Sequence, residues 1–223
     1  MGKLIVIEGV DSSGKATQTK KLFERLKNEG INVSAIEFPN YKSKSSELVK
    51  MYLNGEFGHN ANDTDPYMAS VFFAADRAAS FKKEYNKLLS ECDILIADRY
   101  TTSNMIHQAS KIKETDKKNE FLDWVSDFEY SKLSLPKPDI TIFLDMPVKF
   151  AVKLMAERNN KINNSTIKDI HESDENYLNE SYNNACFVAE RNNWTHIMCV
   201  DGERIKSIDE INDEIYSYVR NIL

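Results

Sequence analysis

Residues 3–15 read KLIVIEGVDSSGK, an apolar run that leads directly into a glycine-rich turn. The turn, Gly9 to Lys15, matches the pattern G-x-x-x-x-G-K. In this pattern the glycines let backbone N–H groups turn inward around phosphates, and the lysine reaches the β- and γ-phosphate oxygens. The next residues, as far as Glu29, have helical spacing and stop at Gly30. The segment therefore predicts a strand, a phosphate-binding loop and a helix whose N-terminal dipole faces the phosphates.

The loop departs from the usual pattern at the residue after the lysine. Ala16 stands where serine or threonine normally contacts Mg²⁺. Thr17 comes one position later, which is about 100° further around the helix. We therefore expect another residue to contact the ion, and Asp11 inside the loop is the candidate.

Strand-like and helix-like segments alternate along the rest of the chain. The runs with strand character are mostly apolar without strict alternation, which is typical of strands buried on both faces of a parallel sheet. They are Lys3–Glu8, Val33–Phe38, Ile94–Asp98, Ile140–Asp145 and His196–Val200. The predicted helices are Lys15–Glu29, Asp65-Pro66 to about Leu89, Asn104–Lys111, Lys118–Ser131, Val148–Glu157, Ser173–Asn192 and Ser207–Asn221. This order predicts an α/β fold, a five-stranded parallel sheet flanked by helices on both faces, within one domain over residues 1–223.

Composition excludes several classes of protein. No stretch approaches the ~20 apolar residues needed to span a bilayer, and MGKLIVIEG at the N-terminus lacks the features of a signal peptide. The net charge of −6 argues against a nucleic-acid partner. Cys92, Cys186 and Cys199 form no metal or disulfide motif and indicate a reducing, cytoplasmic location. The four histidines show no metal-binding spacing either.

One segment differs in composition from the others. Residues 158–172 read RNNKINNSTIKDIHE, polar and rich in asparagine between two helices. A solvated loop and a mobile lid that closes over a substrate both fit this composition.

The chain has few arginines, so their positions are informative. Phe73 and Arg77 are four residues apart in the helix that begins at Pro66, and so share a helix face. An aromatic ring beside a guanidinium can hold the base and a phosphate of one nucleotide, although core packing would also explain the phenylalanine. Arg99 follows Asp98 at the carboxyl end of a strand, where ligands of open α/β sheets bind. A surface ion pair is the alternative explanation for Arg99.

Short motifs along almost the whole chain resemble the thymidylate kinase family of nucleoside monophosphate kinases. In chain order they are IEGVDSSGK at 7–15, FPNY at 38–41, FFAADRA at 72–78, DRYTTSN at 98–104, LPKPDITIFLD at 135–145 and DIHESD at 169–174. Each short motif is weak alone, but their joint order and spacing is specific. The resemblance implies a P-loop kinase fold with a small lid at about 158–172, and transfer of phosphate from ATP to dTMP with Mg²⁺. It also implies a homodimer.

The resemblance assigns roles to individual residues. Lys15, Asp11, Arg99 and Arg158 would be catalytic, with Asp11 near the acceptor sugar or the metal. The ATP phosphates would lie on Gly9, Val10, Asp11, Ser12, Ser13, Gly14, Lys15, Ala16 and Thr17. Arg77 would hold the acceptor phosphate, Phe73 would stack on thymine, and Ser103 and Asn104 would face its edge. The remaining dTMP contacts would be Phe38, Pro39, Tyr41, Arg99, His107 and Glu172.

This chain departs from the family pattern at three positions. Ser12 stands where some members have a loop arginine, and other members supply this cation from the lid. The resemblance therefore implies a cation from the lid here, with Arg158 as the first choice and Lys161 or Lys168 after it. Asn40 replaces an arginine after the Phe-Pro pair, so phosphate binding would depend more on Arg77 and Arg99, with help from Lys42 and Lys44. His107 stands where an aromatic residue near the deoxyribose is common, which leaves the strength of the 2′-deoxy preference open.

Parts of the sequence also fit three other functions. A kinase for another nucleoside monophosphate or for a deoxynucleoside is the nearest alternative, and a deoxynucleoside would need a base such as Asp98 or Glu8. A nucleotide-binding module without catalysis is made plausible by Ala16. A GTPase is disfavoured because residues 160–163, NKIN, lack the final carboxylate of N-K-x-D.

Overall fold

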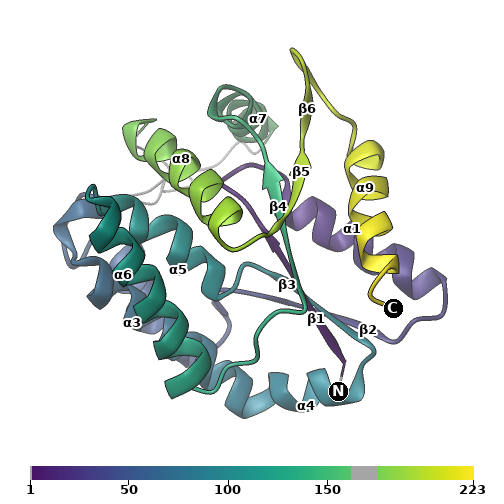
Figure 1. Cartoon of the computed structure of the whole chain (residues 1–223), viewed down its shortest axis with the longest axis horizontal. Helices are drawn as coiled ribbons and strands as arrows, with labels where there is room; N and C mark the ends of the chain where they lie inside the picture. The colour runs from purple at the N-terminus through teal and green to yellow at the C-terminus, as the bar shows by residue number, and fades with distance from the viewer. Residues whose placement is uncertain (1, 162–174) are drawn as a thin grey trace.

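The computed structural model describes residues 2–161 and 175–223, with a five-stranded sheet at its centre (Figure 1). The strands lie in the order β2-β3-β1-β4-β5, and every pairing between neighbours is parallel. The strands are β1 (Lys3–Glu8), β2 (Val33–Glu37), β3 (Ile94–Asp98), β4 (Ile140–Asp145) and β5 (Thr195–Met198). The predicted parallel sheet is confirmed, with the boundaries of β2 and β5 shifted by one or two residues.

The first strand of the chain is the middle strand of the sheet. Its residues Leu4–Ile7 are at most 1% exposed, because strands cover both of its edges and helices cover both faces. Ile5 lies opposite Ile96 in β3 and Ile140 in β4. Since all strands run the same way, their carboxyl ends meet at one edge of the sheet, and the phosphate-binding loop leaves β1 at that edge.

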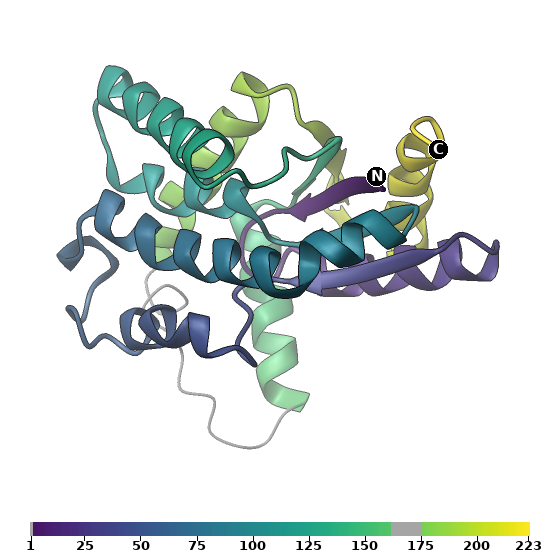
Figure 2. The ribbon, with the colours of Figure 1, turned by 90° about the horizontal axis from the view of Figure 1, so that it is seen from below.

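Helices cover both faces of the sheet (Figures 1 and 2). One face packs against α1 (Lys15–Asn28), α7 (Val148–Lys161) and α9 (Ile208–Arg220). The other face packs against α4 (Asn86–Glu91), α5 (Thr101–His107) and α8 (Glu175–Arg191). Two further helices, α3 (Pro66–Ser80) and α6 (Thr115–Ser126), lie against α5.

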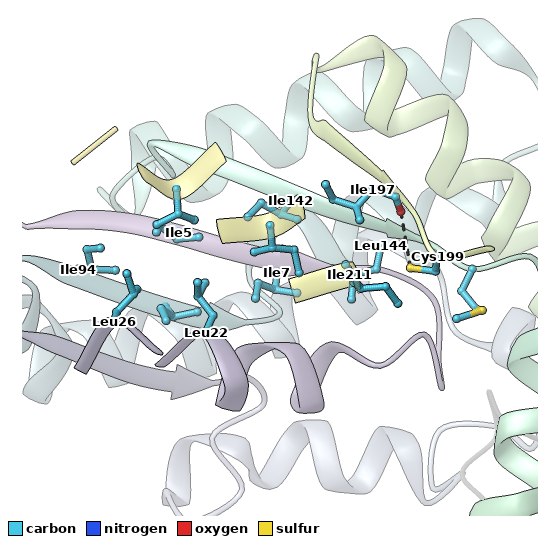
Figure 3. Packing of buried hydrophobic residues seen from close by; sticks show 14 of the residues in the cluster. Ile5, Ile7, Leu22, Leu26, Ile94, Ile142, Leu144, Ile197, Cys199 and Ile211 are labelled. Atoms are coloured by element: carbon cyan, nitrogen blue, oxygen red, sulfur yellow. Dashed lines mark hydrogen bonds between the residues drawn. The ribbon is translucent and has the colours of Figure 1, made fainter. Parts of the chain in front are cut away.

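The core between the sheet and α1 explains why the first forty residues fold as predicted. Ile5 and Ile7 point to the same face of β1 and contact Leu22 and Leu26 of α1, which are four residues apart (Figure 3). All four side chains are fully buried. This is expected where every second residue of a strand and every fourth residue of a helix face each other. Gly30, in the left-handed conformation at φ 82°, follows the end of α1 as the sequence predicted.

The long helix expected after Asp65 is interrupted. Its predicted cap is confirmed, because the Asp65 carboxylate accepts hydrogen bonds from the N–H groups of Tyr67 and Met68. A π-helical turn, Phe81–Tyr85, then separates α3 from α4. Such a turn inserts one extra residue, which hydrophobic spacing does not reveal.

Several short elements were not predicted. They are η1 (Lys44–Ser46), α2 (Glu47–Leu53), η2 (Ala61–Asp63), and the antiparallel pair β6 (Val200–Asp201) and β7 (Arg204–Ile205). None is long enough to show two periods of any pattern. Two predicted helices have different boundaries in the structure. The first, α5, begins three residues earlier than predicted and is followed by η4 (Ala109–Lys111). The second, α6, continues into another π-helical turn, η5 (Asp127–Lys132).

The predicted lid falls mostly outside the described residues. Its first residues, 158–161, form the end of α7, and residues 162–172 lie beyond the described part of the chain. Among the helices that the structure describes, none combines the length and apolar character of a membrane span.

Candidate active site

The phosphate-binding loop has the backbone conformation that its sequence predicted. Gly14 adopts φ 94°, a left-handed conformation that glycine tolerates without cost. A Cβ on Gly9 would lie 2.5 Å from the Ser13 Oγ atom and 3.0 Å from the Leu144 carbonyl oxygen, so a larger residue would not fit there. The hydroxyls of Ser12 and Ser13 are buried without a partner among the described residues. These unpartnered hydroxyls and the glycine conformations would allow the loop to bind an anion.

Lys15 lies over this loop. Its Nζ atom donates hydrogen bonds to the carbonyl oxygens of Gly9, at 2.9 Å, and Val10, at 2.8 Å. Burial, and then the positive charge of Arg99, lowers the pKa of Lys15 to about 8. The ammonium is therefore placed at the loop before any phosphate arrives, and an anion there would favour its charged form.

A pocket beside the loop brings together residues from distant parts of the sequence. All predicted dTMP contacts except Glu172, which is outside the described residues, line this one pocket. They are Phe38, Pro39, Tyr41, Phe73, Arg77, Arg99, Ser103, Asn104 and His107, and Asp11, Leu53 and Gln108 join them. Lys42 and Lys44, considered as helpers, do not line it.

Arg99 connects the pocket to the phosphate-binding loop. It adopts φ 66°, an uncommon conformation for a residue with a side chain, at the turn between β3 and α5. Its guanidinium forms an ion pair with Asp11 of the loop and lies 3.9 Å from the Glu8 carboxylate. Its Nη1 atom donates to the Nε2 atom of His107 at 3.2 Å. Burial disfavours this charge, but Asp11, Glu8 and Asp98 outweigh burial and raise the pKa of Arg99 above its usual value.

Arg77, which lines the pocket, is held in a buried ion pair. Arg77 donates from Nε and Nη2 to the two carboxylate oxygens of Glu129, both at 2.6 Å, and each side chain is at most 2% exposed. The same carboxylate accepts from the Asn104 amide at 2.8 Å. That Arg77 binds the acceptor phosphate stays a prediction. Glu129 already balances much of the positive charge of Arg77.

Ser103 and Asn104, the predicted contacts to the base, have their hydrogens engaged within the protein. The Ser103 hydroxyl donates to Glu8 at 2.8 Å. The Asn104 amide nitrogen donates to the Ser70 carbonyl at 3.1 Å and to Glu129. Toward a ligand these residues therefore offer oxygen lone pairs.

The sequence did not point to Gln108 or Glu129, and it offered Glu8 only as a base for a deoxynucleoside acceptor. Gln108 lines the pocket, and its Oε1 atom is buried without a partner among the described residues. A signal for it existed, because it lies one helical turn after Asn104. Glu8 accepts hydrogen bonds from Gly9, Thr102 and Ser103, and Glu129 holds Arg77 from a distant helix. Nothing in the sequence marks Glu129, since its partner is 52 positions away.

The donors available for a metal are few. The described residues hold no cluster of three or more His, Cys, Asp or Glu side chains suited to an ion. Asp11 offers one carboxylate at the phosphate-binding loop, while Ala16 offers no oxygen from its side chain. A single protein carboxylate fits Mg²⁺, which binds proteins through one or two carboxylates and takes its other ligands from phosphates and water.

Comparison with known proteins agrees with this geometry. The sequence model described as thymidylate kinase matches residues 7–203. Thymidylate kinase of Mycobacterium tuberculosis is 34% identical over 149 residues, 66% of this chain and 68% of that protein. Human thymidylate kinase is 30% identical over 168 residues, 75% of this chain and 72% of its own length. The probable thymidylate kinase of Methanosphaera stadtmanae is 31% identical over 218 residues, 97% of this chain and 98% of that protein. This chain belongs to the thymidylate kinase family.

Proposed function

We propose that the protein transfers the γ-phosphoryl group of ATP to the phosphate of dTMP, giving ADP and dTDP. The observation that carries this proposal is the position of Arg99, which lines the acceptor pocket and pairs with Asp11 of the phosphate-binding loop. One guanidinium there can contact donor and acceptor phosphates together, because its planar fork binds two oxygens.

The chemistry needs charge neutralisation more than proton transfer. The acceptor oxygen belongs to a phosphate whose second pKa is near 6, so it is already mostly dianionic at neutral pH. Lys15 and Arg99 would bring together two polyanions and stabilise the charge of the transferred group. When bound, Mg²⁺ would add neutralising charge on the phosphate oxygens, with Asp11 as its protein ligand. Arg158, whose side chain lies outside the described part of the chain, is proposed as the lid cation.

The geometry argues against Glu8 as the base that a nucleoside acceptor would need. A nucleoside would require a base to deprotonate its 5′-hydroxyl group. Both oxygens of the Glu8 carboxylate already accept hydrogen bonds, from the Gly9 N–H and from the Thr102 and Ser103 hydroxyls. The Glu8 carboxylate therefore orients the loop and the start of α5 and is not placed to accept a proton from a substrate.

An acceptor panel tests the function directly. Purified protein is mixed with Mg·ATP and each of dTMP, dUMP, AMP, thymidine and other nucleoside monophosphates, and ADP formation is followed. We expect ADP with dTMP, less with dUMP, and none with thymidine or AMP. Turnover with a different acceptor would overturn the roles of Phe73, Ser103 and Asn104, and ATP binding without turnover on any acceptor would favour a binding module.

We also propose that the chain, as a single domain over residues 1–223, forms a homodimer through α3. Every exposed residue of this helix is apolar: Tyr67, Met68, Val71, Ala75 and Ala79. A surface helix normally exposes charged or polar residues on its outer face, so this uncharged face fits a second copy of the chain. The three free thiols fit a reducing compartment, and we propose the cytoplasm.

A further inference from the structure

Glu129 is a buried carboxylate that binds three side chains behind the acceptor pocket. It lies on the π-helical turn η5, is 1% exposed, and is not part of the pocket lining. Its Oε2 atom accepts from Arg77 and from the Thr101 hydroxyl, at 2.6 and 2.9 Å. Its Oε1 atom accepts from Arg77 and from the Asn104 amide, at 2.6 and 2.8 Å. Arg77 supplies the positive charge that lets this carboxylate remain buried.

This carboxylate determines which end of the Asn104 side chain faces the pocket. A side-chain amide has an NH₂ end with two hydrogens and a C=O end that only accepts. In Asn104 the two hydrogens go to Glu129 and to the Ser70 carbonyl. The reversed orientation would point the amide oxygen at a carboxylate and a carbonyl, both acceptors, so it is strongly disfavoured. Asn104 must therefore present its oxygen.

We propose that Glu129 is a positioning residue that sets the base preference of the pocket by fixing Asn104 as an acceptor. The inference rests on the proposed function, in which Asn104 faces the edge of the base. A thymine edge presents the N3–H group as a donor, which the Asn104 oxygen can accept. A cytosine edge presents an N3 lone pair, which that oxygen would repel. Glu129 thus selects dTMP over dCMP without touching either nucleotide.

The variant Glu129→Gln tests this role with little change in volume. The introduced amide has one acceptor oxygen in place of two, although Arg77 donates to both positions. Arg77, Thr101 and Asn104 then share that oxygen without a negative charge, so the Ser70 carbonyl holds more of the orientation of Asn104 than in the wild-type protein. We expect the ratio of dTMP to dCMP affinity to fall by up to about tenfold. Isothermal titration without ATP measures both affinities independently of turnover.

Asp145→Asn is the matched control. Asp145 is also a buried carboxylate held by two side chains, Tyr182 and His196, and it does not line the acceptor pocket. Its substitution should leave the dTMP to dCMP ratio at the wild-type value. An unchanged ratio in Glu129→Gln, or an equal loss of affinity for both nucleotides, would overturn the positioning role.

A second variant covers the case in which Glu129→Gln does not fold. Glu129→Asp keeps both oxygens and the charge that balances Arg77, but its side chain is one methylene shorter, which draws the carboxylate away from Asn104. We expect a smaller fall in the same ratio, and an unchanged ratio in this folded variant would also overturn the role. Wild-type protein that binds neither nucleotide, or prefers dCMP, would remove the proposed acceptor itself, an outcome distinct from a failure confined to the variants.

Discussion

Arg99 is the residue on which the proposed transfer most depends. It reaches the phosphate-binding loop through Asp11 and the pocket through His107, so its loss removes a cation from between the two phosphates. We predict that Arg99→Ala lowers kcat by about 100- to 1,000-fold while the protein stays folded. Steady-state kinetics with a thermal unfolding measurement check this. Arg191→Ala, which removes a surface ion pair with Asp123, serves as the control. Near-normal turnover in Arg99→Ala would exclude it from the catalytic set.

Lys15 gives a prediction that depends on pH. Its pKa is lowered to about 8, so above this pH the ligand-free protein loses a charge that a lysine ordinarily keeps to about 10.5. ATP phosphates favour the charged form, so ATP binding at pH 8.5 should take up a proton, and ATP affinity should fall between pH 7 and 9.5. Titration calorimetry in buffers of different ionisation enthalpy measures the proton uptake.

Lys111 offers a matched control for this titration. Its pKa is also lowered to about 8 by burial, but it binds Tyr52 and Thr64 rather than the loop. The variant Lys111→Met should therefore keep the ATP-linked proton uptake. Absence of uptake at pH 8.5 in the wild-type protein would contradict the role given to Lys15.

Single residues were predictable where a local pattern carries the chemistry. The glycines and Lys15 of the loop follow from a motif, and Phe38, Phe73 and Arg99 follow from short motifs of the family. Glu129 could not be found this way, because its function lies in contacts with residues of two other helices that only the folded chain brings together. Even for Arg77, whose place in the pocket was predicted, its pairing with Glu129 was not.

At the scale of elements, the helix ends were predicted best where capping residues mark them. α9 begins at a reciprocal cap, in which Ser207 and Glu210 each bond the other's backbone N–H group. We predict that Ser207→Ala lowers the free energy of unfolding by about 1 kcal/mol and the melting temperature by about 2–4 °C, with unchanged turnover. Ser217→Ala, on the exposed side of the same helix, should have little effect. Equal melting temperatures for both variants would contradict the cap.

The end of α7 and the residues that follow it carry the prediction for the lid. Under the proposal that the lid supplies the cation that Ser12 does not, we predict that Arg158→Ala lowers kcat more than it weakens dTMP binding. Separate measurement of kcat and of dTMP affinity tests this. If Lys161→Ala has that effect and Arg158→Ala does not, the lid assignment is wrong.

Elements were predicted where burial imposes one period over many residues. β1, β3 and β4 were located from their apolar runs because each is buried on both faces. The π-helical turns were not, since one inserted residue breaks the helical period without leaving a sequence signal. Glu129 lies on one of these turns, η5. The sequence therefore did not predict the element that places this carboxylate behind the pocket.

At the scale of the molecule, the outer face of α3 predicts assembly. We expect the wild-type protein to sediment at twice the chain mass of 25.7 kDa, and Val71→Asp to sediment as a monomer, because an unpaired charge in an apolar interface is costly. Val152→Asp, at an exposed position of similar accessibility on α7, should remain a dimer. A wild-type monomer at micromolar concentration would contradict the interface.

The position of β1 in the sheet has a consequence for synthesis on the ribosome. β1 is made first, yet its neighbours are residues 94–98 and 140–145. The nascent chain therefore carries its phosphate-binding loop for on the order of ten seconds before either flanking strand exists. We expect nucleotide binding only after β4 has left the exit tunnel, and until then β1, four of whose six residues are apolar, has no neighbouring strand.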